Sequence, residues 1–370
     1  QKNSLANITQ VKIYNDEKYL NLGAVARRNL ELTETERRRE KRGSLLWVLD
    51  KTKTAPGKRM LRSWVEQPLI SVTGIVYRQN AVEELFEKNQ IRTELQDAFL
   101  GINDLERITT RIVYGSANAK ELRSLENTAA RLPVIRELIA SSECRMLQDI
   151  YSRIDTLSDL RELIDAAIVD EPPFSVREGA MIKDGYHSEL DELRAILNGG
   201  KDYLARIQLE EQEKTGIKKL KIGYNRVFGY YIEVLNSFKD LVPDHYIRKQ
   251  TLSNCERYIT PELKELESKV LGAQERITKL EYELFCDIRN KIAEAQFRLR
   301  DTASAVAALD ALCSLAFVAQ NNGYVRPEVN MGDTIDIRDG RHPVVEKLLK
   351  TPFVSNDTYL DNSTDRCAII

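Results

Sequence analysis

Residues 217–260 carry many basic side chains and are flanked by stretches with a helical pattern. This segment, called the basic segment below, holds eight lysines and arginines and four acidic residues, which gives a formal charge of +4. The whole chain stands at −2, so the remaining residues carry the difference, −6. Lysine and arginine neutralise phosphates and release the counterions of a polyanion on binding. The charge pattern therefore predicts contact with a polyanion.

Polar hydrogen-bond donors accompany these charges in two places. Asparagine, serine and threonine donate to phosphate oxygens, and such contacts position a protein on a nucleic acid without reading its sequence. The composition favours backbone contact over base readout, while a solvated strand face remains the alternative. Tyr224, Tyr230 and Tyr231 are expected to form a small core rather than stacking platforms for bases. The residues with this mix are Asn225, Arg226, Arg248, Lys249, Thr251, Ser253 and Asn254.

Catalytic and metal chemistry are not indicated. A phosphate-binding P-loop requires Ser or Thr after its Gly-Lys pair, and neither Gly-Lys pair here, at 57–58 and 200–201, has one. The five cysteines and three histidines lack metal-ligand or disulfide spacing, and reduced thiols are typical of the cytoplasm. We expect His342, in GRHPVVE, to be structural rather than a ligand or a general base. We predict no catalytic residue, no metal site and no bound cofactor in this chain.

Two heptad-patterned stretches must position the basic segment. Apolar residues recur at alternating spacings of three and four over 190–207 and again over 263–284. Ser188 and the sequence Thr260-Pro261-Glu262 mark the helix starts. The pattern predicts an antiparallel coiled-coil arm, whose second helix runs from about 261 to 300 and is about 60 Å long. Gly200 falls on the apolar seam, where it permits either close helix approach or a kink.

The basic segment itself has strand character. KIGYNRVFGYYIEV alternates and is rich in aromatic and β-branched residues, and Gly223 and Gly229 permit turns. HYIRKQTL is a second strand candidate. These patterns predict a small antiparallel sheet at the tip of the arm.

The rest of the chain predicts a multi-helix core. Ser44 and Thr54 are placed to cap two helices, and Pro68 ends the second. Apolar residues recur at helical spacing from 75 to about 170, and ASAVAALDALCSLAFVAQ predicts a buried helix. Residues 331–370 change to short strand-like pieces: DTIDIRDG, GRHPVVEKLL and RCAII. No apolar run approaches the roughly 20 residues of a membrane span, so no membrane association is expected. The predicted fold is mainly α, with a helical core, a coiled-coil arm and a β tip.

Several segments, taken in order, resemble the MutS family of DNA mismatch-repair ATPases over essentially all 370 residues. They are RRNLELTE, GSLLWVLDKTKTAPGKRMLRSWVEQPL, IKDGYHSELDELR, TGIKKLKIGYNRVFGYYIEV, RKQTLSNCERYITPELKELE and GRHPVVE. The resemblance implies a helical core and lever at 1–186, a clamp arm at 187–300 with its tip at 217–260, a return helix at 301–330, and the start of an ATPase domain at 331–370.

In this family the clamp grips the backbone of double-stranded DNA without reading its sequence. The resemblance carries that role onto Asn225, Arg226, Arg248, Lys249, Thr251, Ser253, Asn254 and Arg257. It also implies a mismatch-reading domain before Gln1 and a P-loop after Ile370, so we expect this chain alone neither to recognise a mismatch nor to hydrolyse ATP. Phe353 matches a position that lines the adenine pocket in the full-length protein.

The resemblance further implies partners that lie outside this chain. The full-length protein would use ATP and Mg²⁺, form a homodimer mainly through its ATPase domains, act with a MutL-type repair partner and be cytoplasmic. This chain alone is expected to be a monomer or a weak dimer. The competing interpretation is a non-catalytic coiled-coil module that docks another protein, with an incidental charge at its tip. Protein capture that depends on the tip, without DNA binding, would favour that module.

Overall fold

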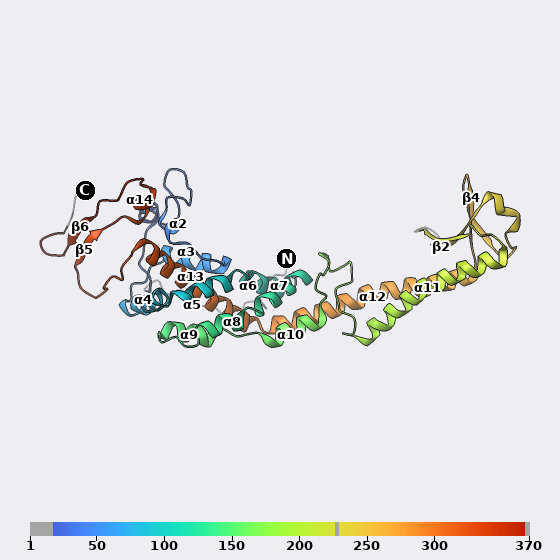
Figure 1. Cartoon of the computed structure of the whole chain (residues 1–370), viewed down its shortest axis with the longest axis horizontal. Coiled ribbons are helices and arrows are strands. Elements are labelled where there is room, and N and C mark those ends of the chain that lie inside the picture. The colour runs from blue at the N-terminus through green and yellow to red at the C-terminus, as the bar shows by residue number, and fades with distance from the viewer. Residues whose placement is uncertain (1–17, 226–228, 367–370) are drawn as a thin grey trace, which may run out of the picture. The chain divides into compact units, whose positions relative to one another are not determined.

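The computed structural model describes residues 18–225 and 229–366 (Figure 1). As predicted, these residues are mainly α-helical, with small antiparallel sheets. They divide into two compact units, each described by itself below. The first comprises Gln1–Val113, Ser124–Arg161 and Glu294–Ile370, and the second comprises Tyr114–Arg123 and Glu162–Ala293.

Helices occupy most of the chain between residues 45 and 167, as the helical spacing predicted. Ser44 Oγ accepts a hydrogen bond from Trp47 N, and Thr54 Oγ1 accepts one from Gly57 N, so both predicted caps are confirmed. The helices are α1 (Ala24–Asn29), α2 (Leu45–Leu49), α3 (Ala55–Glu66), α4 (Val72–Glu87), α5 (Asn89–Phe99), α6 (Leu105–Val113), α7 (Ala119–Ala129), α8 (Leu132–Leu138), α9 (Arg145–Arg153) and α10 (Ser158–Ala167).

Helix α13 (Gln296–Asn322) is the centre of the first unit and packs against α3, α4, α5, α6 and α9. Its buried Asp310 accepts hydrogen bonds from Thr54 N, Thr54 Oγ1 and Lys53 N, which ties α13 to the start of α3. By length and composition α13 could cross a membrane. The expectation that no apolar run approaches the length of a membrane span was therefore wrong for this helix. However, 78% of its most apolar window is buried inside the unit, as in a core helix.

The C-terminal part of the first unit contains strands β5 (Ile335–Gly340) and β6 (Asn356–Leu360), which pair antiparallel. The strand-like interpretation of GRHPVVEKLL was wrong, because this segment contains helix α14 (Pro343–Leu348). His342 caps the helix: its Nδ1 accepts from the backbone N–H groups of Val344 and Val345 at 3.3 Å. The structural role expected for His342 is therefore confirmed. Most of RCAII lies outside the described residues.

Two long helices, α11 (Ser188–Thr215) and α12 (Pro261–Glu294), dominate the second unit. The cap at Thr260 is confirmed, since its Oγ1 accepts from Leu263 N. The predicted helix 261–300 is shorter than expected, because α12 ends at Glu294 and α13 begins after Ala295. Most of the predicted seam positions on α12 are buried, and those described on α11 are buried or half-buried. Continuous coiled-coil packing of the two helices stays a prediction, and the surroundings of Gly200 lie outside what the structure describes.

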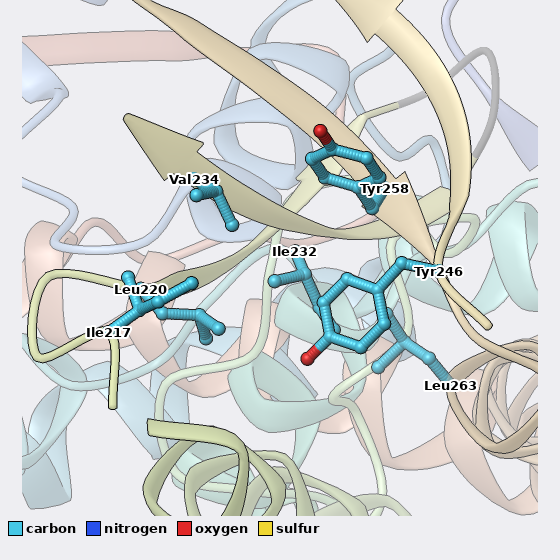
Figure 2. Close-up of a cluster of buried hydrophobic side chains, with 7 residues drawn as sticks. All are labelled: Ile217, Leu220, Ile232, Val234, Tyr246, Tyr258 and Leu263. Carbon is cyan, nitrogen blue, oxygen red and sulfur yellow. The ribbon is translucent and has the colours of Figure 1, made fainter. Parts of the chain in front are cut away.

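The predicted small sheet is confirmed. Its four strands, called the tip sheet below, are antiparallel in the order β1-β2-β4-β3. Gly216 ends α11 with φ of +71°, a left-handed turn that directs the chain into the sheet. Leu263 of α12 belongs to the sheet's hydrophobic core, whose buried residues Figure 2 shows. Leu204 of α11 packs against this core. The strands are β1 (Lys221–Asn225), β2 (Gly229–Leu235), β3 (Ile247–Thr251) and β4 (Cys255–Ile259), with a 3₁₀ helix η3 (Asn236–Leu241) between β2 and β3.

Candidate nucleic-acid interface

The strand register places two of the predicted contact residues, Asn225 and Thr251, at opposite ends of the tip sheet. Asn225 pairs with Gly229, beside the β1–β2 connection. Thr251 pairs with Glu256, beside the β3–β4 turn. Because Leu235 at the far end of β2 pairs with Cys255, the β3–β4 turn lies at the end away from Gly229. With a rise of about 3.3 Å per residue, strand β2 separates these ends by roughly 20 Å.

The β3–β4 turn presents exposed polar groups, as the sequence indicated. Thr251, Ser253 and Asn254 are all exposed. The turn is held by Leu252 N donating to Cys255 O at 2.8 Å, and by Asn236, whose backbone and side-chain nitrogens donate to the carbonyls of Asn254 and Ser253. These bonds use backbone carbonyls and leave the Ser253 hydroxyl and the Asn254 amide side chain facing solvent. The turn therefore presents hydrogen-bond donors that suit phosphate oxygens.

At the opposite end, Asn225 is half-buried at the close of β1. Arg226, predicted to follow it in a turn, lies outside the described residues. The structure therefore places one member of this predicted pair and adds nothing on the other.

The two predicted cations of strand β3 differ in whether a carboxylate lies close to them. Arg248 Nη1 lies 3.4 Å from Oε1 of Glu256, and Lys239 Nζ lies 3.2 Å from the same oxygen. Lys249 occupies an irregularity in the register between Arg248 and Gln250 and is exposed, and its ammonium has no hydrogen bond or ion pair with any described residue. Glu256 thus partly compensates Arg248, whereas the ammonium of Lys249 keeps its full charge for a ligand.

Arg257 is held on the face of the sheet opposite the core. Its guanidinium lies over the Tyr231 ring at 4.3 Å, pairs with Glu233 at 3.1 Å and donates to Gln250 Oε1 at 3.0 Å. These three partners come from β2 and β3, the strands on either side of β4. Arg257 therefore stabilises the sheet through side chains of both neighbouring strands, and its contact with DNA stays a prediction.

The tyrosines divide into core and surface groups. Tyr230 packs against the core cluster, as expected, but Tyr224 is 49% exposed and meets Tyr230 edge to face, with 5.1 Å between ring centroids. Tyr231 lies on the opposite face beneath Arg257. The fully packed rings are instead Tyr246 and Tyr258, 5.9 Å apart (Figure 2). The core role expected for all three residues was therefore only partly right.

Two buried carboxylates anchor those packed tyrosines. Tyr246 OH donates to Glu211 Oε2 at 2.5 Å, and Tyr258 OH donates to Glu256 Oε2. Burial would raise the pKa of Glu211, but the hydrogen bonds from Tyr246 and Lys214 lower it. The bond from Tyr258, followed by that from Lys239, holds the pKa of Glu256 below its usual range against the effect of burial. Burial and the bond to Glu256 raise the pKa of Tyr258 to about 12.

Sequence reasoning left three lysines out of the candidate site. Lys218, Lys219 and Lys221 were counted in the charge of the basic segment, but no asparagine, serine or threonine stands beside them to mark a phosphate contact. All three are exposed, and they line a hollow of about 420 Å³ with Gln208 and Gln212 of α11 and with Leu220, Glu233 and Leu235. The clustering of three lysines within residues 218–221 was the signal that could have identified them.

The remaining predicted positions lie in the first unit. Phe353 is half-buried in the connection between α14 and β6. Gly57 lies inside α3, so its Gly-Lys pair is part of a helix and not of a phosphate-binding loop.

Comparison with known proteins matches the chain to the family model described as MutS domain III, over residues 25–316. The chain is 52% identical to the DNA mismatch repair protein MutS of Lachnoclostridium phytofermentans, 50% to that of Acetivibrio thermocellus and 51% to that of Ruminiclostridium cellulolyticum. Each match covers 100% of this chain and 40%, 43% and 42% of the respective relative. The chain therefore spans about two fifths of the length of these curated relatives.

Proposed function

Because the chain belongs to the MutS family of DNA mismatch repair proteins, we propose that its tip sheet clamps double-stranded DNA through the phosphate backbone, without reading sequence. The observation that carries this proposal is the concentration of positive charge in residues 217–260 of an otherwise negative chain. The exposed ammonium of Lys249 and the polar turn at Ser253 and Asn254 support it, because they combine charge with hydrogen-bond donors.

A salt titration tests the proposal. Binding of a labelled, fully paired duplex should weaken with salt, and each phosphate contact should contribute about −0.9 to the slope of log K against log salt concentration. Two duplexes of unrelated sequence should give the same slope, since phosphates are common to both. A slope near zero, or binding to one sequence only, would refute backbone clamping.

A triple variant tests the contribution of the β3–β4 turn and of strand β3. Replacing Lys249, Ser253 and Asn254 together by alanine should weaken binding and reduce the steepness of the slope by about one contact for the lysine. The matched control is Lys264→Ala, which removes one exposed charge from α12 outside the sheet. Equal losses in both variants would argue for a diffuse charge effect instead of a contact at the turn.

The activities of the longer protein are part of the same proposal. By family membership we propose that a full-length protein binds mismatched DNA, hydrolyses ATP with Mg²⁺, forms a homodimer and works with a MutL-type partner in the cytoplasm. Phe353 would then line the adenine pocket. ATP turnover by the 370-residue chain alone would contradict the assignment of ATPase activity to a region outside it.

A further inference from the structure

The cations of the tip sheet are not equally available to a ligand. Lys239 and Arg248 share Glu256, and Arg257 pairs with Glu233. The ammonium groups of four further lysines form no hydrogen bond or ion pair with any residue that the structure describes; these lysines are Lys218, Lys219, Lys221 and Lys249. Three of these four unpaired lysines line the same hollow, between the end of α11 and the start of β1.

The hollow has a fixed wall formed by two glutamines of α11. Gln208 Oε1 accepts a hydrogen bond from Ile222 N at 2.9 Å, and Gln212 Nε2 donates to Leu220 O at 2.7 Å. These bonds tie the helix to the beginning of β1. Because Gln208 uses its oxygen for this bond, its amide nitrogen keeps both hydrogens for an acceptor in the hollow.

One carboxylate also lines the hollow, and its charge is compensated. Glu233 Oε2 lies 3.1 Å from Nε of Arg257, so the repulsion that Glu233 would exert on an anion is reduced. The three lysines therefore dominate the local charge. The hollow also lies at the same end of the sheet as the β3–β4 turn, because Lys221 pairs with Glu233 and Leu235 pairs with Cys255.

We propose that Lys218, Lys219 and Lys221, together with the amide of Gln208, form a phosphate-binding site that takes the phosphodiester backbone of duplex DNA. This inference rests on the proposed function and locates its main contact. The strand of DNA would run from this hollow toward Ser253 and Asn254, along one end of the sheet. Arg248 and Arg257, already engaged with carboxylates, contribute less than these lysines.

The test uses the 370-residue chain and a short, fully paired duplex. The triple variant Lys218→Gln, Lys219→Gln and Lys221→Gln removes the charges and retains similar side-chain length. We expect the slope of log K against log salt to become less steep by about 2 to 3, at about 0.9 for each lost contact. The triple replacement of the same lysines by arginine should keep the slope.

The charge-matched control carries Lys264→Gln, Lys279→Gln and Lys291→Gln, all exposed on α12 and outside the sheet. It should retain the slope of the unchanged chain. If the unchanged chain shows no salt-dependent binding, the proposed function itself fails. If the unchanged chain binds and the first triple variant keeps its slope, or the control loses as much, this site is refuted while DNA clamping stands.

Chemical protection gives a readout that does not depend on variants. Lysines of the free chain and of its duplex complex are acetylated briefly and quantified by mass spectrometry. Duplex should reduce acetylation of Lys218, Lys219 and Lys221 several-fold and leave Lys264 and Lys291 unchanged. Equal labelling of the three lysines in both samples, at duplex concentrations that saturate binding, would overturn the site.

Discussion

Arg248 is paired with the buried carboxylate of Glu256, with 3.4 Å between Nη1 and Oε1. The same oxygen attracts Lys239 at 3.2 Å, and the other oxygen accepts the hydroxyl of Tyr258. The carboxylate of Glu256 therefore binds two cations and one tyrosine of the core. The positive charge that the sequence shows on β3 is consequently reduced where a ligand would meet it.

Removing this acid should strengthen DNA binding. In Glu256→Gln the charges of Arg248 and Lys239 are no longer compensated, so each becomes available for a phosphate. We expect tighter duplex binding and a salt slope steeper by about 0.9 to 1.8, which corresponds to one or two added contacts. Fluorescence anisotropy over a salt series measures both quantities.

The control for this change is Glu262→Gln, which alters the net charge equally at an exposed position in the first turn of α12. It should leave the slope nearly unchanged. Equal steepening in both variants would mean that net charge, and not the release of Arg248 and Lys239, governs binding.

Acid should destabilise the tip sheet through Glu211 and Glu256. Both have pKa values lowered below 4.5 in the folded chain, with hydrogen bonds from Tyr246 and Tyr258 among the causes. A carboxyl whose folded pKa is lowered contributes stability above its unfolded pKa, and this contribution is lost as pH falls through the folded pKa. We expect the urea midpoint of the sheet, followed by methyl NMR signals of Ile232 and Val234, to fall between about pH 5 and about pH 3.

The double variant Glu211→Gln and Glu256→Gln provides the comparison. It should be less stable than the unchanged chain near neutral pH and should lose less stability on acidification. A midpoint that falls equally in both proteins would place the acid sensitivity in other carboxylates.

Local rules predicted those features of the fold that depend on neighbouring residues. The caps at Ser44, Thr54 and Thr260 follow from side-chain oxygens that reach backbone N–H groups within three residues. The missed helix α14 is only six residues long, too short for apolar periodicity to appear, although His342 followed by Pro343 is a start signal. The break at Ala295 has no Gly or Pro to mark it.

The features of the candidate site that the sequence could not predict depend on how strands distant in the sequence pair with one another. The strand order β1-β2-β4-β3 separates Asn225 from Ser253, although both belong to one basic segment. The register also brings Glu256 to Arg248 and Glu233 to Arg257, and these pairings select which cations stay unpaired. The composition gives the number of charges, but only the strand register shows which cations lie next to a carboxylate.

Gly57 should be intolerant of a side chain. A Cβ at this position would lie 2.2 Å from Oδ2 of Asp310, the oxygen that accepts from Thr54 N and Oγ1. Alanine normally stabilises a helix by about 1 kcal/mol over glycine, but overpacking of a tight core costs about 1 to 3 kcal/mol. We expect Gly57→Ala to lower the urea midpoint of the first unit, followed by the fluorescence of Trp47 and Trp64.

The matched control is Gly272→Ala in α12, where an added Cβ would meet nothing within 4 Å. There the helix propensity should act alone and stabilise the helix by about 1 kcal/mol, as measured by circular dichroism during urea unfolding. Stabilisation by Gly57→Ala as well would show that the Asp310 side chain can move aside without cost.

The contact between α11 and α12 should depend on the pair Arg194 and Glu281. Glu281 is 1% exposed, and Arg194 Nη2 donates both to its Oε1 and to the carbonyl of Ile182 at 2.9 Å. Removing one partner of a buried pair leaves the other charge uncompensated and costs about 3 to 5 kcal/mol, whereas an apolar pair of similar volume is often neutral. Arg194→Met should therefore destabilise the second unit strongly, and adding Glu281→Leu should restore much of that loss.

A double-mutant cycle on urea unfolding of the second unit measures this coupling directly. The control cycle uses Arg276 and Glu189, a second pair between α11 and α12 at 2.8 Å whose side chains are each more than 40% exposed. Solvent screens that pair, so its coupling should stay below about 1 kcal/mol. Additive losses at Arg194 and Glu281 would mean that the buried pair does not hold the two helices together, and that their apolar faces alone support the tip sheet.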